Sequence, residues 1–191
     1  MNVALRKPSM TREQFFQWVG AQEERYEFDG FEPVAMVRVT NNHSLICQRI
    51  YRALDGRLRD GACTVLGPDA GLATVGDTVR YPDALVTCTK VPGAAYLVPG
   101  VIVVFEVISP TSGRNDRIVK LREYRAVPSI RRYVILESRS TGLLVMFHTD
   151  ADTDWTATAL PVEDMPEIGI SMPVAEFYDG LDLTYPAMPD A

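Results

Sequence analysis

The sequence is poor in the residues that usually build soft-metal and redox sites. It has two histidines, His43 and His148, and three cysteines, Cys47, Cys63 and Cys88, with no Cys-x-x-Cys pair. An odd number of widely spaced cysteines is typical of reduced thiols in a cytoplasmic protein and predicts no zinc site. Two isolated histidines likewise argue against a metal site built from histidine.

Long apolar runs are also missing. No stretch approaches the ~20 apolar residues of a membrane-spanning helix, and the first ten residues lack the apolar core of a secretory signal. We therefore expect a cytoplasmic protein with no membrane contact. With 47% apolar and 23% charged residues, the chain is predicted to form one globular domain over residues 1–191, with a core from about 11 to 183.

Basic residues are absent from one end of the chain. Residues 141–191 contain ten acids and no lysine or arginine, and the net charge of the chain is −6. Residues 114–132 instead carry seven basic residues against two acids. Such a cluster suits a phosphate backbone, but it is also typical of a solvated helix face. The overall charge argues against a protein that coats nucleic acid.

Two carboxylates occupy unusual positions. Glu106 is the one polar residue in the run Val101–Ile108, which predicts a strand buried on both faces. Asp83 follows Pro82 and precedes the apolar segment 84–86. A carboxylate in such a place needs a cation, a metal or several donors to offset its desolvation. On neighbouring strands the two acids would lie close together, and like charges that close need a metal or a shared proton.

A helix predicted over residues 116–124 would add a cation. Ile118 and Leu121 give it an apolar stripe, and Lys120 and Tyr124 share another face because they are four residues apart. Two acids and a lysine are what metal-assisted phosphodiester hydrolysis needs: Asp83 and Glu106, with the Val107 carbonyl, would bind Mg²⁺ or Mn²⁺, and Lys120 would orient water and offset phosphate charge. Two alternatives remain open, a buried Glu106–Lys120 ion pair and a turn capped by Asp83.

These residues resemble a known family. The chain is similar to the Uma-type family of putative restriction endonucleases, a branch of the PD-(D/E)XK nuclease superfamily. The residues that carry the resemblance are Pro82-Asp83, Glu106-Val107-Ile108-Ser109-Pro110-Thr111, Asp116, Lys120 and Tyr124. The superfamily pattern would place its lysine at position 108, which is Ile108 here. In the Uma-type family the lysine is understood to lie on the following helix, which falls on Lys120.

The resemblance implies a restriction-endonuclease-like α/β fold, a central mixed sheet flanked by helices. It also implies an endonuclease that cleaves nucleic acid, with DNA as the expected substrate and Mg²⁺ or Mn²⁺ as cofactor. Asp83, Glu106 and Lys120 would be catalytic, and Glu27, His43 and Tyr124 would support them. Glu27 could equally be a cross-strand partner of a lysine or arginine, and His43 a helix cap or local hydrogen bonder.

The remaining elements follow from capping and periodicity. Hairpins near both termini should extend the central sheet, and the strand–helix–strand order around residues 101–137 allows a parallel crossover. The expected elements are a helix opened by a Thr11–Gln14 capping box, a hairpin over 25–36 with an Asp-Gly turn, a helix from 41 to about 61 with an asparagine cap, strands over 62–66, 78–87, 101–108 and 131–137, a hairpin from 143 to 160 around an acidic turn at 150–154, and a strand over 168–174.

The sequence thus predicts a metal-dependent nuclease with an exposed cleft. Lys120 should point into that cleft, and part of the basic cluster 114–132 should lie on its rim. Two other readings stay open: a catalytically degenerate nucleic-acid-binding module on the same fold, and a structural or interaction protein whose acid–lysine cluster is an ion-pair core. A homodimer is one assembly that the sequence leaves open.

Overall fold

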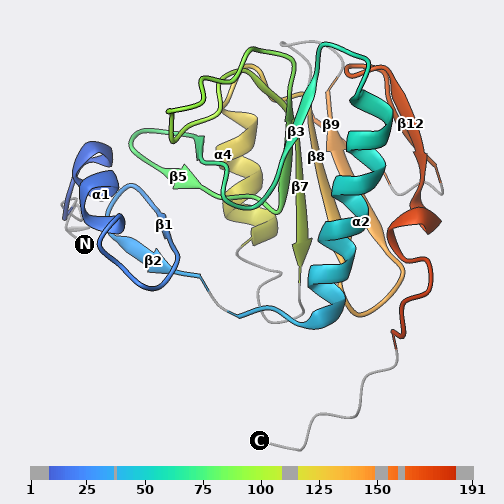
Figure 1. Cartoon of the computed structure of the whole chain (residues 1–191), viewed down its shortest axis with the longest axis horizontal. Coiled ribbons are helices and arrows are strands. Elements are labelled where there is room, and N and C mark those ends of the chain that lie inside the picture. The colour runs from blue at the N-terminus through green and yellow to red at the C-terminus, as the bar shows by residue number, and fades with distance from the viewer. Residues whose placement is uncertain (1–8, 37, 109–115, 149–154, 159–161, 184–191) are drawn as a thin grey trace, which may run out of the picture.

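The computed structural model describes residues 9–36, 38–108, 116–148, 155–158 and 162–183, and its centre is a six-stranded mixed sheet (Figure 1). The strand order is β10-β9-β8-β7-β6-β3. The strands span β3 (Thr64–Leu66), β6 (Ala84–Thr87), β7 (Val101–Ile108), β8 (Arg132–Glu137), β9 (Leu143–Phe147) and β10 (Thr156–Thr158). This is the α/β architecture that the sequence predicts.

Strand β7 is the buried strand expected from its apolar run. It pairs antiparallel with β6 and parallel with β8, so the predicted parallel strand–helix–strand unit is present. Side chains alternate between its two faces. Val103, Phe105 and Val107 belong to one core cluster, and Val104 and Ile108 belong to the other. Each cluster is covered by a different helix.

Helix α2 (Asn41–Leu58) covers the first of these faces with a buried stripe of isoleucines and leucines at positions 46, 50, 54 and 58. Its N-cap is Thr40, whose side chain accepts a hydrogen bond from the backbone N–H of His43. The predicted asparagine cap is therefore wrong by one residue. Thr40 is the last residue with extended backbone angles, and its hydroxyl does the capping that Asn41 was expected to do.

The second face is covered by α4 (Leu121–Arg125), which a π-helical turn, η1 (Asp116–Lys120), precedes. The side chains of Lys120, Glu123 and Tyr124 point inward and are buried. The predicted apolar stripe is only half right, because Leu121 packs on the core while Ile118 is 54% exposed. The wider π-helical turn changes the phase that an α-helical spacing assumes. The segment 109–115, which includes Ser109-Pro110-Thr111, lies outside the described residues.

The N-terminal part forms a smaller layer beside the main sheet (Figure 1). Helix α1 (Arg12–Val19) opens with the predicted capping box between Thr11 and Gln14. The predicted hairpin is formed by β1 (Tyr26–Phe28) and β2 (Pro33–Ala35). It does not extend the central sheet as expected, because β1 pairs with β5 (Val79–Arg80) in a separate sheet of order β2-β1-β5-β4, where β4 is Leu72–Ala73.

A break at Tyr81-Pro82-Asp83 divides the strand expected over residues 78–87. Its first half is β5, in the small sheet, and its second half is β6, in the central sheet. Proline has no backbone N–H to donate to a ladder, so the strand ends there. Arg80 therefore lies in the small sheet, and Asp83 lies just before the strand that joins the central sheet.

The C-terminal prediction is confirmed in part. The β9–β10 hairpin extends the central sheet, as expected, but β11 (Val162–Met165) and β12 (Ile170–Pro173) pair only with each other among the described strands. A 3₁₀ turn, η2 (Val174–Phe177), follows and packs on α2. The acidic turn expected at 150–154 lies outside the described residues.

The expectation of three reduced cysteines is wrong for two of them. Cys63 and Cys88 form a disulfide, and Cys47 is free. Thr64 of β3 pairs with Thr87 of β6. Cys63, just before Thr64, and Cys88, just after Thr87, therefore lie opposite each other at the end of the two strands. Among the described helices, none is both long and apolar enough to cross a membrane.

Candidate active site

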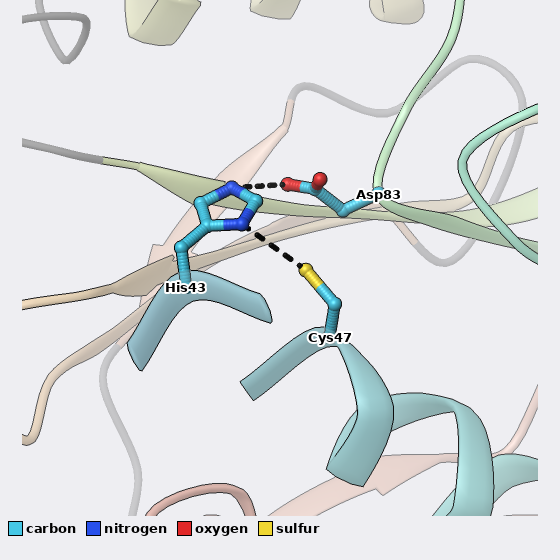
Figure 2. Close-up of side chains that lie close together, drawn as sticks. All are labelled: His43, Cys47 and Asp83. Atoms are coloured by element: carbon cyan, nitrogen blue, oxygen red, sulfur yellow. Dashed lines mark hydrogen bonds and ion pairs between the residues drawn. The ribbon is translucent and has the colours of Figure 1, made fainter. Parts of the chain in front are cut away.

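Asp83 lies at the start of β6, beside the end of β7. The β6–β7 register pairs Ala84 with Phe105, which puts Asp83 next to Glu106 and Val107. Its Oδ2 accepts a hydrogen bond of 2.7 Å from the backbone N–H of Val107. The same oxygen is 3.3 Å from Nε2 of His43, which α2 presents from its first turn (Figure 2). The carboxylate thus joins the end of the sheet to the start of the helix.

Glu106 is held from the opposite face of the sheet. Its Oε1 accepts 2.8 Å hydrogen bonds from Lys120 Nζ and from the Tyr124 hydroxyl. Glu106 is 6% exposed. Burial raises its pKa to about 7; Lys120 opposes this shift, and the carboxylates of Asp83 and Glu27 add to it. Lys120 and Tyr124 therefore both contact the same oxygen of Glu106.

The ion-pair network continues beyond the predicted residues. Lys120 Nζ is also 3.5 Å from Glu27 Oε1. The other oxygen of Glu27 is 3.1 Å from Arg80, whose guanidinium binds Glu123 through two hydrogen bonds of 2.6 and 2.7 Å. All of these side chains are at most 11% exposed. Glu27 is thus the cross-strand partner of an arginine and also lies near the lysine, while its supporting role at the site stays a prediction.

Arg80 and Glu123 were missed by the sequence reasoning. Glu123 had a detectable signal, because it follows Lys120 by three residues and therefore shares its helix face. The sequence signal for Arg80 was weaker, and consisted only of its position just before the Tyr81-Pro82-Asp83 break. Nothing in the sequence shows that β5 pairs with β1 and so brings Arg80 to Glu27.

The charges of this cluster fit a divalent cation. Four carboxylates, those of Glu27, Asp83, Glu106 and Glu123, face two permanent cations, Lys120 and Arg80. When all four carboxylates are ionised, two negative charges are left over at a largely buried place, where uncompensated charge is costly. The raised pKa of Glu106 expresses that cost. Carboxylate and carbonyl oxygens are also the ligands that Mg²⁺ and Mn²⁺ prefer.

His43 compensates part of this charge. Burial lowers its pKa, but the hydrogen bond and charge of Asp83, hydrogen bonding to the Val107 carbonyl and the charge of Glu106 outweigh burial, and the pKa is raised overall. The imidazole therefore faces both Asp83 and the Val107 carbonyl. These are two of the three groups expected to bind a metal, so His43 contacts the predicted ligands, and its supporting role stays a prediction.

A cavity of about 1140 Å³ opens on the Asp83 side of the sheet. Asp83, His43 and Cys47 line it together with three arginines, Arg25, Arg38 and Arg52. The expectation that Lys120 points into an exposed cleft is wrong, because Lys120 is 8% exposed and packs against Glu106 on the other side. Positive charge near the cavity comes from segments other than the predicted cluster.

The predicted cluster 114–132 is dispersed in the structure. Arg131 and Arg132 line a different cavity of about 920 Å³, and Arg132 is paired with Glu167. Arg122 and Arg125 are exposed on α4. Arg114 lies outside the described residues. Among the cluster members whose side chains the structure describes, Lys120 reaches the acids of the candidate site, through its ion pair with Glu106.

Two proteins are similar to this chain over most of its length. An uncharacterized protein of Synechocystis sp., slr1290, is 29% identical over 180 residues, which cover 91% of this chain and 94% of that protein. The crystal structure of a putative nuclease of the DUF820 group from Anabaena variabilis superposes with a TM-score of 0.70 at 12% identity, covering 88% of this chain and 97% of the other. At 12% identity, the similarity between the two structures shows a shared fold and nothing more.

The sequence profile of the Uma2 family, described as putative restriction endonuclease, matches residues 12–175. The match spans every residue of the candidate site, from Glu27 to Tyr124, and both helices that position them. The resemblance seen in the sequence is thereby confirmed. The chain belongs to the Uma2 family of putative restriction endonucleases.

Proposed function

We propose that this protein hydrolyses phosphodiester bonds in nucleic acid, DNA first, with Mg²⁺ or Mn²⁺ bound by Asp83, Glu106 and the Val107 carbonyl. The observation that carries the proposal is the meeting of Asp83 with Glu106 and Val107 at the end of β6 and β7, with Lys120 on Glu106. Two acids and a lysine at one end of a mixed sheet, in a family of this kind, supply the groups that the reaction needs.

The bound cation would supply Lewis acidity at the phosphate. Lys120 would offset the charge that grows on the phosphate oxygens and orient the attacking water. Cation binding at Glu106 competes with the Lys120–Glu106 pair, and the second contact of Lys120, with Glu27, keeps the ammonium group in the site. His43 would hold Asp83 in place, and Tyr124 would hold Glu106.

The substrate would enter through the 1140 Å³ cavity, because that cavity leads to Asp83. Arg38 and Arg52 line it and would contact phosphates, whose charge lysines and arginines neutralise with release of counterions. Arg25 also lines it but is bound to Asp69 and to the Pro68 carbonyl. Tyr51, 43% exposed on α2, offers a ring on which a base can stack.

One observation favours a second candidate. Lys120 is buried against Glu106, which is the arrangement of a structural ion pair. On that reading the chain is a degenerate nuclease that keeps the scaffold and binds nucleic acid without cleaving it. The two candidates differ in whether the folded protein, with Mg²⁺ or Mn²⁺ present, cleaves the nucleic acid that it binds.

The test combines cleavage with metal binding. We expect the purified protein to cleave DNA only when Mg²⁺ or Mn²⁺ is added, and Asp83→Asn and Glu106→Gln to lose both cleavage and metal affinity, the latter measured by titration calorimetry. Lys120→Ala should keep metal affinity nearly intact while turnover falls by ~10²–10³-fold, as is typical when one transition-state stabiliser is removed. Arg59→Ala, in an exposed pair with Asp55, is the control and should change neither.

Two outcomes would contradict the proposal. If well-folded protein binds neither ion at millimolar concentration, the metal site does not exist as described. If Lys120→Ala lowers stability but leaves turnover per folded molecule unchanged, the lysine is structural and takes no part in catalysis.

A further inference from the structure

Beside the all-oxygen site lies a cluster with different chemistry. His43 and Cys47 are four residues apart on α2 and therefore share a helix face. His43 Nδ1 is 3.5 Å from Cys47 Sγ, and His43 Nε2 is 3.3 Å from Asp83 Oδ2 (Figure 2). With one ligand atom from each residue, the three atoms all lie within 4.8 Å of one another. Figure 2 shows the imidazole between the carboxylate and the thiol.

The separations suit one small ion. With Zn–S near ~2.3 Å and Zn–N or Zn–O near ~2.1 Å, the ligand atoms of a tetrahedral zinc are ~3.3–3.8 Å apart. The two distances to His43 are in this range. The two distances involve different nitrogens of the imidazole, so one side chain must rotate to bring all three ligand atoms to the same ion. The rotation needed is small, because one ligand atom from each residue already lies within 4.8 Å of the other two.

The ligand types select the metal. A nitrogen, a sulfur and an oxygen ligand are the set that Zn²⁺ accepts, whereas Mg²⁺ keeps to oxygen. All three residues line the 1140 Å³ cavity, so an ion and a fourth ligand from solvent can reach them. Cys47 is the one free thiol of the chain, since the other two cysteines are joined to each other.

The thiol is not a spontaneous nucleophile in this place. Burial raises the pKa of Cys47, and the charges of Asp83 and Glu106 raise it further. A divalent cation between the thiol and Asp83 offsets the negative charges that raise the pKa of Cys47. Ion binding therefore releases the thiol proton to solvent and leaves a bound thiolate. The same excess of negative charge that favours Mg²⁺ favours a softer cation here.

We propose that His43, Cys47 and Asp83 form a binding site for Zn²⁺ or a similar borderline transition-metal ion. The site takes Asp83 from the proposed magnesium site, so an ion bound there prevents Asp83 from holding Mg²⁺. Zinc is therefore an inhibitor that binds next to the reaction centre and competes for one shared carboxylate. The binding stands by itself, and the inhibition rests on the proposed nuclease function.

Cobalt is the direct probe of binding. We expect the metal-free full-length protein to bind one equivalent of Co²⁺, with the near-ultraviolet thiolate-to-cobalt charge-transfer band, and to lose the band when Zn²⁺ is added. Cys47→Ser should abolish the band and weaken zinc binding by at least the ~10–100-fold that loss of even an outer partner of a metal ligand costs. Gln48→Ala, next along α2 and lining the same cavity, is the matched control and should keep both.

Cleavage assays test the inhibition. At saturating Mg²⁺, Zn²⁺ should inhibit the native protein and Gln48→Ala equally, and Cys47→Ser should need at least ~10-fold more Zn²⁺ for the same inhibition. Absence of the charge-transfer band, or a band that survives in folded Cys47→Ser, would overturn the site. Equal inhibition of native protein and Cys47→Ser would overturn the competition. If no Mg²⁺-dependent cleavage exists, the proposed nuclease function fails, and the cobalt result alone decides this inference.

Discussion

Charged side chains are buried to different degrees on the two faces of the central sheet, at the end where Asp83 and Glu106 lie. On the α4 side, Glu106, Lys120, Glu27, Arg80 and Glu123 are almost fully buried and satisfy one another. On the α2 side, the Asp83 side chain is slightly more exposed, at 16%, and Asp83 and His43 both line a cavity. The two acids of the candidate site therefore lie in different surroundings. Asp83 is the acid that solvent and ligands reach, and Glu106 is the acid whose charge the protein interior must support.

The largest expected effect is on the buried side. Arg80→Ala leaves Glu27 and Glu123 without their shared cation, so we expect the free energy of unfolding to fall by ~3–5 kcal/mol. Asp83→Asn on the cavity side keeps an oxygen acceptor for Val107 and should cost no more than ~1 kcal/mol. Urea unfolding at neutral pH measures both. Arg59→Ala, which breaks an exposed pair, is the control, with a cost of at most ~0.5 kcal/mol. A similar cost for Arg80→Ala and Arg59→Ala would contradict the comparison.

A smaller effect should appear in the pH dependence of stability. The pKa of Glu106 is raised from 4.5 to about 7 in the folded protein, so the folded state holds this proton more tightly than the unfolded state. The contribution of Glu106 is therefore fully favourable below about pH 4.5 and is lost as the pH rises to about 7. Relative to native protein, Glu106→Gln should gain stability over that interval, by an amount on the order of 3 kcal/mol at most.

Urea unfolding at about pH 5 and about pH 8 gives the difference between the two proteins at each pH. Mg²⁺ should reverse the trend in native protein, because a cation favours the ionised carboxylate, and should have little effect on Glu106→Gln. Parallel pH profiles for native protein and Glu106→Gln would show that Glu106 titrates at its ordinary value.

The smallest effect concerns the side on which nucleic acid binds. Arg52→Ala, in the cavity, should weaken DNA binding a few-fold and reduce the slope of log Kd against log salt by about 1, because one phosphate contact is lost. Arg122→Ala, exposed on α4, is the matched control on the other side. Fluorescence anisotropy in Ca²⁺, which is used in place of Mg²⁺ to avoid cleavage, measures both. If Arg122→Ala has the larger effect, nucleic acid binds on the α4 side, where the sequence placed its basic cluster.

Local patterns predicted the parts of the site that lie within one element or two adjacent ones. Glu106 was detectable because a carboxylate interrupts an apolar run, and Lys120 and Tyr124 because helical spacing puts them together. The family resemblance added His43 and Glu27, which the structure places beside Asp83 and Lys120. The order of strands and helices in the central sheet followed from the same patterns.

The rest depends on pairings between distant segments. Arg80 reaches Glu27 and Glu123 only because β5 leaves the central sheet and pairs with β1. The Cys63–Cys88 disulfide depends on the β3–β6 register, which cysteine spacing does not reveal. The arginines of the cavity come from three separate segments, so no run of charge in the sequence marks them.

The hydrogen bond from Val107 N–H to Asp83 has a consequence for how such a site can be lost. The side chain of Asp83 takes the place of a backbone acceptor just beyond the last β6–β7 pair, so it closes the strand ladder as well as offering a charge. Alanine removes both functions and leaves a backbone donor unsatisfied, at a cost of ~1–3 kcal/mol. Asparagine removes only the charge. If Asp83 binds the proposed metal ion, a relative with asparagine at this position would keep the strand end intact but lose that ion. The proposed catalysis would then disappear through one mild substitution that leaves the fold unchanged.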